Sequence, residues 1–305
     1  MRVCIVAEGC YPFVVGGVSS WIHSMIRLFP NTEFVILAIA ANRSLRGKYA
    51  YELPENVSEV YELYLQDVDW SKKHRRRQRL KKEQYRALRS LILDQDVQWN
   101  VLFDLFQKND VSLNDILMGE DFLHAVTDCY NLKYSQLVFS DFLWTMRSIY
   151  LPVFITFQME LPKADLYHCV ATGYAGVLGS MAKHIYGSRL LVSEHGIYTR
   201  EREEELIKAK WVNGIYKNIW IDQFRKMSKL AYQESSLVTS LFEQARQLQI
   251  ELGCPPEKIA VTPNGIRVEN LQNISGKLPE DEDKINIGAV LRVTPIKDVK
   301  TMIQA

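Results

Sequence analysis

The chain has 305 residues, of which 47% are hydrophobic and 24% charged, with 37 Lys and Arg against 36 Asp and Glu. At about 150 residues per domain, the length predicts two domains, and the apolar fraction is large enough to form their hydrophobic cores. The composition excludes disordered, collagen-like and disulfide-stapled chains. The longest apolar run, residues 34–41, is far shorter than the roughly 18 residues that span a bilayer. The N-terminus reaches Glu8 without the apolar core of a secretory signal, so we expect a cytoplasmic protein. Its cysteines include no Cys-x-x-Cys pair, so we expect no metal site built on them.

The first forty residues predict a strand, a helix and a second strand. Arg2–Ala7 and Thr32–Ala40 are apolar runs rich in branched residues, which is typical of buried strands. The apolar residues of the helix recur at i, i+3 and i+4 spacing: Val18, Trp21, Ile22, Met25, Ile26 and Phe29. A strand, a helix and a strand of these lengths make a βαβ unit, which implies a parallel sheet with helices on its faces.

Residues 41–160 fit this alternation poorly, and we predict an insertion packed beside the sheet. For its aromatic residues the first interpretation is packing and the second is a partner or acceptor surface. These residues include Trp99, Phe103, Phe106, Phe122, Phe139, Phe142 and Trp144.

Within the insertion, residues 71–90 carry ten Lys or Arg and one acidic residue, which leaves the rest of the chain with a net charge of −8. Leu80, Tyr85, Leu88 and Leu91 recur at helical spacing and predict a basic amphipathic helix. A solvated helix face and contact with anionic lipid or an acidic partner both stay open as interpretations. Nucleic acid is not expected, because no aromatic platform accompanies the charges.

After residue 160 the alternation of strands and helices resumes. Strands are predicted at Leu166–Val170, Arg189–Ser193, Leu237–Ser240 and Lys258–Thr262. Helices are predicted at Ala175–Tyr186, from Arg200 to about Ser235, and up to Leu252. The fold class is therefore α/β, with a Rossmann-like parallel sheet in an N-terminal domain over residues 1–267.

Beyond this domain, residues 268–284 lose periodicity and predict an interdomain linker. A new strand and helix are expected over residues 285–305, as the start of a second domain.

Candidate binding residues follow the predicted strands. Gly16 and Gly17 open the first helix, where free amides and the absence of side chains suit a phosphate or a sugar hydroxyl, although glycines that serve only the turn remain an equal interpretation. His168 and the pair Glu194 and His195 end two later strands, at the edge where open α/β sheets bind ligands. A structural role is the commoner one for any single histidine, but two at neighbouring strand ends indicate a site.

The most specific local feature is residues 290–298, where a strand delivers Arg292 and Lys297 follows near a helix start. Two cations beside free amides suit a diphosphate without a metal ion. The G-x-G-x-x-G fingerprint is absent from the sequence, which disfavours a nicotinamide enzyme.

Four motifs together resemble a known family. They are the opening Val3–Trp21, Ser193–Arg202, Pro263–Gly265 and Arg292–Asp298. The chain resembles the PelF-type glycosyltransferases of Pel exopolysaccharide biosynthesis, which contribute to biofilm and belong to the retaining glycosyltransferase family 4 with a GT-B fold of two Rossmann-like domains. The resemblance implies metal-independent transfer of a sugar from a nucleotide donor, expected to be UDP-linked, to a polysaccharide acceptor, with no further cofactor.

The resemblance also implies roles for the candidate residues. Gly16 and Gly17 would approach the donor, and Arg292 and Lys297 would clamp its diphosphate. His168 and His195 would line the cleft beside the transferred sugar, with Glu194 supporting that wall. Asn264 would lie at the approach to the hinge between the domains. Inner-membrane synthase subunits, or anionic lipid contacted through residues 71–90, would place the protein at the cytoplasmic membrane.

One family feature lies beyond this sequence. The pair of glutamates eight residues apart that holds the donor lies deep in the family's C-terminal domain, and the sequence ends at Ala305, about 20 residues into that domain. We therefore expect a truncated chain that does not catalyse by itself. The alternative function is a non-enzymatic, partner-binding module of a membrane polysaccharide synthase, and a nicotinamide oxidoreductase comes third.

Overall fold

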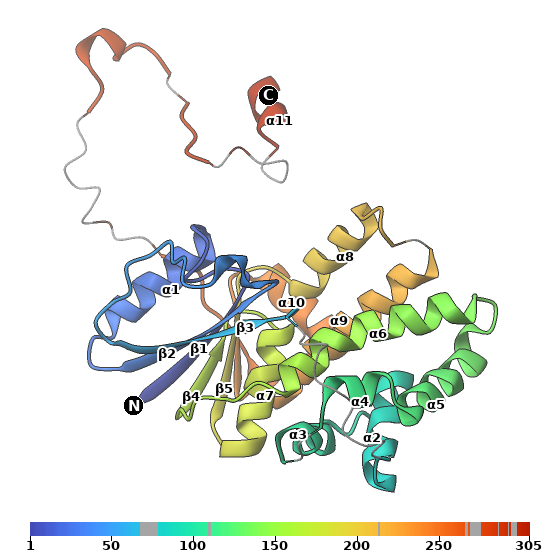
Figure 1. The fold of residues 1–305 in the computed structure, drawn as a ribbon. Coiled ribbons are helices and arrows are strands. Elements are labelled where there is room, and N and C mark those ends of the chain that lie inside the picture. The colour runs from blue at the N-terminus through green and yellow to red at the C-terminus, as the bar shows by residue number, and fades with distance from the viewer. Residues whose placement is uncertain are drawn as a thin grey trace. The chain divides into compact units, whose positions relative to one another are not determined.

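A computed structural model describes the chain except for residues 68–78, 109–110, 213, 266–267, 269–275, 286, 292 and 294–297. The chain forms two compact units, Met1–Pro263 and Asn264–Ala305 (Figure 1). None of the helices in the described ranges is long and apolar enough to cross a membrane.

The first unit is built on a seven-stranded sheet with the strand order β3-β2-β1-β4-β5-β6-β7. All neighbouring strands pair in parallel. The strands are β1 (Arg2–Glu8), β2 (Glu33–Ala40), β3 (Val57–Tyr64), β4 (Leu166–Cys169), β5 (Arg189–Glu194), β6 (Leu237–Ser240) and β7 (Ile259–Val261). The predicted α/β class with a Rossmann-like parallel sheet is confirmed.

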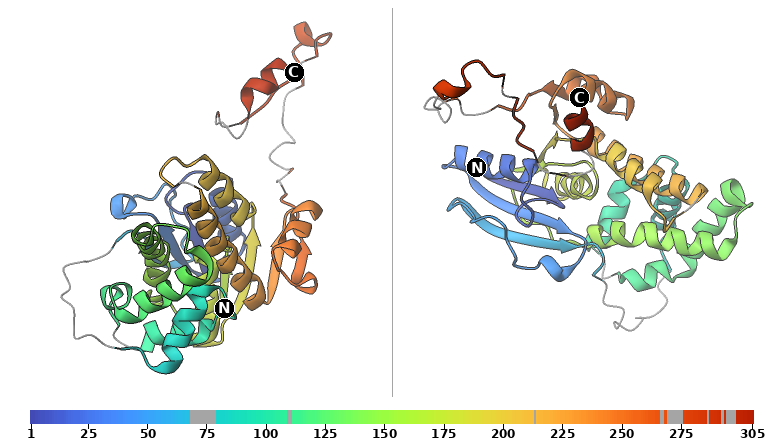
Figure 2. Two further views of the ribbon diagram at one scale, coloured as in Figure 1. Left: turned by 90° about the vertical axis from the view of Figure 1, so that its right-hand side faces the viewer. Right: turned by 90° about the horizontal axis from the view of Figure 1, so that it is seen from above.

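Helices follow most of the strands and cover both faces of the sheet (Figures 1 and 2). Along the chain the α-helices of this unit are α1 (Gly17–Leu28), α2 (Lys82–Leu93), α3 (Trp99–Lys108), α4 (Leu113–Leu117), α5 (Glu120–Cys129), α6 (Phe139–Phe157), α7 (Tyr174–Tyr186), α8 (Tyr198–Lys208), α9 (Ile215–Glu234) and α10 (Glu243–Glu251). Three single turns complete it, namely the 3₁₀ turns η1 (Arg43–Leu45) and η3 (Pro256–Lys258) and the π turn η2 (Tyr130–Tyr134).

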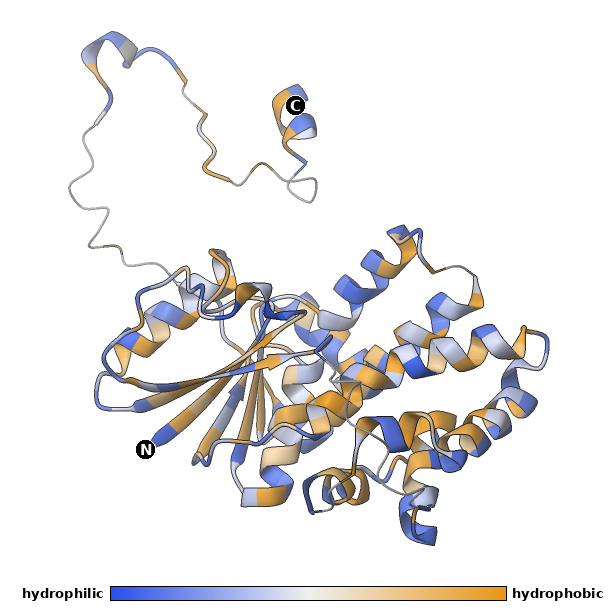
Figure 3. Ribbon diagram, in the orientation of Figure 1, coloured by the Kyte–Doolittle hydropathy of each residue, from blue (hydrophilic) through white to orange (hydrophobic). Residues whose placement is uncertain are grey.

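The two faces of β1 belong to different cores. Val3 and Ile5 pack with Ile22 of α1, whereas Cys4 and Val6 belong to the larger core that contains α7 and the insertion. Because successive residues of a strand point to opposite faces, a strand covered on both sides is apolar throughout, as its sequence is. Figure 3 shows the same pattern as apolar strands under helices with polar outer faces.

The insertion differs from its predicted extent of residues 41–160. Val57–Tyr64 forms β3, which pairs with β2 at the edge of the sheet, so the helical insertion begins after it. This strand was missed because Val57 is only partly buried and the next two residues, Ser58 and Glu59, are polar and exposed, unlike those of a central strand. Packing is confirmed for Trp99, Phe103, Phe106, Phe122 and Phe142, which belong to the core or pack against it, whereas Trp144 is 59% exposed.

The predicted basic helix over residues 71–90 begins later than expected. Helix α2 starts at Lys82, while residues 68–78 lie outside the described part of the chain. Leu88 and Leu91 are buried, as their spacing predicts. The Nζ atom of Lys226 in α9 donates to the Leu91 carbonyl at 2.7 Å, which satisfies an end of α2 that no intrahelical bond reaches.

The long helix predicted from Arg200 to about Ser235 is two helices, α8 and α9. They are separated near Gly214, whose φ of +55° lies in the left-handed region that favours glycine.

The described residues of the second unit form a 3₁₀ turn, η5 (Pro279–Asp281), and a helix, α11 (Val299–Gln304). The strand expected from residue 285 is not formed by the described residues 285 and 287–291, where Ile285 is 90% exposed. The described residues of this unit supply no neighbouring strand that would complete the hydrogen bonds of such a strand.

Replacing Gly176 with alanine is expected to lower the free energy of unfolding by about 1–2 kcal/mol. A Cβ atom at this position would lie 2.4 Å from the Cβ atom of Ala231, so α7 and α9 would have to separate, and the ~1 kcal/mol gain in helix propensity would not offset this cost. Gly17→Ala is the matched control, because no atom lies within 4 Å of its Cβ position. Denaturant unfolding measures both, and equal stability of the two variants would contradict the argument.

Candidate functional site

The order of the strands predicts where in the sheet a ligand site lies. β2 and β3 lie on one side of β1, and β4 to β7 on the other. At such a switch point the chain leaves neighbouring strands toward opposite faces, and a crevice forms at the carboxyl edge of the sheet. Here β1 ends at Glu8 and β4 at Cys169, and the loop after β5 begins at His195.

His168 lies in β4 and is buried, with 6% of its surface exposed. Its Nε2 atom lies 2.7 Å from the Ser193 Oγ atom, which accepts a hydrogen bond from the Thr239 hydroxyl at 2.7 Å. Because Ser193 accepts from Thr239, its own proton is available for a hydrogen bond to Nε2 of the neutral imidazole. Burial, and secondarily the nearby His195, lowers the pKa of His168 to about 4, so the ring is neutral at pH 7.

His195 is the candidate with an unused polar atom. Its Nε2 atom is buried and has no hydrogen-bond partner among the described residues. The Trp21 ring of α1 lies edge-on to both histidines, with centroid distances of 4.4 Å to His195 and 5.7 Å to His168. Burial lowers the pKa of His195. A buried imidazole nitrogen without a partner is costly unless a ligand or solvent satisfies it, which makes His195 the best-placed ligand contact of the predicted set.

Glu194 is buried and fully engaged. Its Oε2 atom accepts from the Tyr232 hydroxyl at 2.5 Å and from Gln249 Nε2 at 2.9 Å. Its Oε1 atom accepts from the Thr172 hydroxyl at 3.1 Å and from the backbone N–H of Tyr198 at 3.2 Å. Burial raises the pKa of Glu194 and these four hydrogen bonds oppose the rise. The carboxyl group therefore joins four segments behind the crevice and has little capacity left for a ligand.

Glu8, at the end of β1, was not among the predicted site residues. Its carboxyl group accepts from the Tyr198 hydroxyl at 2.9 Å and from the Ala175 N–H at 3.3 Å. Burial raises the pKa of Glu8, whereas these hydrogen bonds and the nearby Arg202 lower it to a smaller extent. An acidic residue directly after a buried apolar strand was the signal that could have identified it.

Trp21 was predicted as part of the apolar face of α1. The structure confirms that Trp21 packs against the core around α1, and it also places the ring beside the two histidines. Helical periodicity predicts that a residue faces the sheet but not that it reaches the sheet's carboxyl edge, so no local signal distinguished Trp21 from its core neighbours.

Gly16 and Gly17 begin α1 without a side-chain cap. No atom lies within 4 Å of the Cβ position of either residue, so the approach to the helix N-terminus is open. The helix dipole and the unpaired N–H groups of its first turn favour a negatively charged or hydroxyl-bearing ligand here.

Three further predicted residues, Asn264, Arg292 and Lys297, stay predictions. Asn264 is exposed and belongs to the second unit. Arg292 and Lys297 lie outside the described residues. In the described ranges, no group of three or more His, Cys, Asp or Glu side chains is arranged to hold a metal ion. The described edge therefore offers neutral imidazoles, an open helix N-terminus and rigidly held carboxyl groups.

Comparison with known proteins gives one family and a distant structural likeness. The family described as "Domain of unknown function (DUF3492)" matches residues 1–257. No curated protein matches the chain. Among solved structures, the chain is similar to the crystal structure of Anabaena HepE in complex with UDP and glucose, with 13% sequence identity and a TM-score of 0.40. The likeness covers 91% of this chain, which spans about half, 47%, of that one.

Proposed function

We propose that this chain, which belongs to the family described as a domain of unknown function (DUF3492), forms the acceptor-side part of a glycosyltransferase that uses a nucleotide-linked sugar. The observation that carries the proposal is the unpaired, buried Nε2 atom of His195 beside Trp21, at the switch point of a parallel sheet. The four motifs that resemble the PelF-type enzymes also support it, and they include this histidine and the open glycines of α1.

In this proposal the reaction needs no metal ion, retains the anomeric configuration and uses a UDP-linked donor. His195 donates to or accepts from a hydroxyl of the transferred sugar, and the N-terminus of α1 approaches the donor through Gly16 and Gly17. Arg292 and Lys297 neutralise the diphosphate as it leaves, because two cations stabilise the charge that develops on it.

The remaining candidates act through their neighbours. His168 stays neutral and supports the histidine pair through Ser193. Glu194 positions the loop that carries His195, since its carboxyl group accepts the backbone N–H of Tyr198 just beyond it. Asn264 remains a proposed hinge contact.

The location and partners of the protein are part of the same proposal. A cytoplasmic protein that extends an exopolysaccharide would meet its synthase subunits or anionic lipid at the membrane, through the basic residues 71–90. Flotation with vesicles that contain anionic lipid tests this, and neutralising residues 72–82 is the informative variant.

We expect His195→Ala to lower the rate of UDP release from UDP-sugars by about tenfold or more in the full-length protein, because the loss of one hydrogen bond to the sugar is worth about that factor. UDP-hexoses and UDP-N-acetylhexosamines form the panel, and His124→Ala, at an exposed position in α5, is the matched control. Binding of no UDP-sugar, together with no effect of Arg292→Ala, would overturn the proposal.

A further inference from the structure

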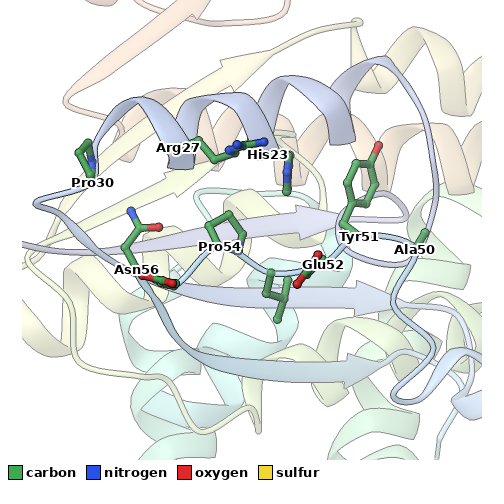
Figure 4. A pocket seen from close by; sticks show the side chains of 10 residues that line it. His23, Arg27, Pro30, Ala50, Tyr51, Glu52, Pro54 and Asn56 are labelled. Carbon is green, nitrogen blue, oxygen red and sulfur yellow. The ribbon is translucent and has the colours of Figure 1, made fainter.

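A groove of about 630 Å³ lies beside α1, between this helix and residues 50–56. Its volume is in the range of ligand sites. One wall is α1 and the other is the extended segment 50–56 that leads into β3 (Figure 4). A right-handed parallel crossover from β2 to β3 runs on the same face as α1. Since this crossover contains η1 but no α-helix, space remains beside α1 that such a helix would fill.

The wall opposite α1 is fixed at both ends. The Ala50 N–H donates to the Pro12 carbonyl at 2.8 Å. At the other end, the side-chain amide of Asn56 lies 3.1 Å from the carbonyl oxygens of Ile26 and Phe29, at the end of α1. The groove is therefore preorganised, which lowers the conformational cost of binding.

Aromatic rings form one end of the groove. The rings of His23 and Tyr51 lie 5.2 Å apart between centroids, and buried Tyr11 lies 5.2 Å from Tyr51. The Tyr51 hydroxyl is 3.2 Å from the Ser20 Oγ atom, one helical turn from Gly16. The groove thus starts near the open N-terminus of α1 and runs along the helix.

Charged side chains on its two walls are left for a ligand. Arg27 projects from α1, and Glu52 and Glu55 belong to the opposite wall. In the part of the chain that the structure describes, no ion pair or side-chain hydrogen bond engages these three residues. Two carboxylates against one guanidinium disfavour a phosphate-bearing ligand, whereas these planar groups suit pairs of neighbouring hydroxyls.

We propose that this groove binds a segment of a neutral glycan, with a sugar ring against Tyr51 and hydroxyl groups between Arg27 and the two glutamates. This inference rests on the proposed function, because it assigns the groove to the acceptor chain that the transferase extends. The glycan enters along α1 and presents its end near Gly16 and Gly17.

Isothermal titration with cellohexaose and with chitohexaose, without nucleotide, tests the groove directly. We expect at least one of them to bind, and Tyr51→Ala to weaken binding by about three- to tenfold through loss of the ring contact. Glu52→Gln should weaken binding without touching the aromatic cluster, and Glu257→Gln, at an exposed position elsewhere, should not change it. Binding should stay constant between about 50 and 300 mM NaCl, because a neutral ligand is not screened.

The outcomes separate this inference from the proposed function. Two results would contradict glycan binding in the groove even if the protein turns over UDP-sugars. One is that neither hexaose binds at about 10 mM, and the other is that Tyr51→Ala and Glu52→Gln leave binding unchanged. If the affinity falls steeply as the salt concentration rises, and a lysine-rich peptide binds in the same way, the groove would bind a cationic ligand and not a neutral glycan. If the groove variants weaken glycan binding but the protein binds no UDP-sugar, the result would support the groove as a glycan site and contradict the proposed transferase activity.

Discussion

Replacing Glu194 with leucine is expected to lower the free energy of unfolding by roughly 3–5 kcal/mol. The substitution removes the carboxylate that accepts hydrogen bonds from the Tyr232 hydroxyl, Gln249 Nε2, the Thr172 hydroxyl and the Tyr198 N–H. Each buried donor that is left unsatisfied costs about 1–3 kcal/mol, and local relaxation recovers part of the sum. Denaturant unfolding followed by circular dichroism measures the change.

Two further variants serve as controls for this measurement. Glu194→Gln keeps one acceptor oxygen but turns an NH2 group toward donors, so its loss should be intermediate. Glu257→Leu, at an exposed position, should change stability by less than about 0.5 kcal/mol. A stable Glu194→Leu variant would mean that the carboxyl group does not join these segments.

The same residue has a readout beyond stability. If Glu194 positions the His195 loop, Glu194→Gln should let solvent reach His195, and the pKa of that ring should return toward its ordinary value. Proton NMR titration of the histidine ring signals follows this shift. A His195 pKa that does not move in Glu194→Gln would leave Glu194 with a role in stability alone.

Lowering the pH from 7 to 4.5 should destabilise the wild-type protein by about 2–3 kcal/mol more than it destabilises His168→Gln. Burial lowers the pKa of His168 to about 4 in the folded state, whereas the unfolded chain has a value near 6.5. Between these values the unfolded state binds more protons, so stability is full above pH 6.5 and is lost as the pH falls. Within this window, each unit by which the pH falls lowers the free energy of unfolding by about 1.4 kcal/mol.

The comparison with His168→Gln is needed because other buried groups act in the opposite sense. Burial raises the pKa values of Glu8 and Glu194, so their ionisation lowers stability as the pH rises above about 4.5. Both proteins retain these carboxyl groups, and the difference between the two stability curves isolates His168. Denaturant unfolding between pH 4.5 and 7.5 gives these curves, and parallel curves would show that the histidine is not buried in its neutral form.

Local sequence patterns predicted most of the sheet. Leu237–Ser240 is predicted and found with the same bounds, and β1 and β2 each differ by one residue at one end. The interiors of β1 and β2 are covered on both faces, so they are apolar, and polar residues bound them. Edge strand β3 was missed because its burial is partial and its sequence carries acidic residues, which local patterns do not separate from a loop.

The positions of some candidate residues in the sheet were predicted for a similar reason. His168 and Glu194 with His195 were found because each lies at or next to a predicted strand end, and a parallel sheet gathers its carboxyl ends at one edge. Their different chemistry was not predictable from position. Only the packed structure shows that Glu194 is saturated with donors while the Nε2 atom of His195 has no partner.

The sequence by itself determined the alternation of strands and helices, and with it the parallel sheet, because hydrophobic periodicity reflects which faces each element buries. It also determined which residue types stand at the strand ends. Only the tertiary structure decided which of them share an environment, since Trp21 meets the histidines and segment 50–56 meets α1 through contacts between elements far apart in the chain. Such contacts depend on the order of the strands and on the path of each connection, which no local pattern records.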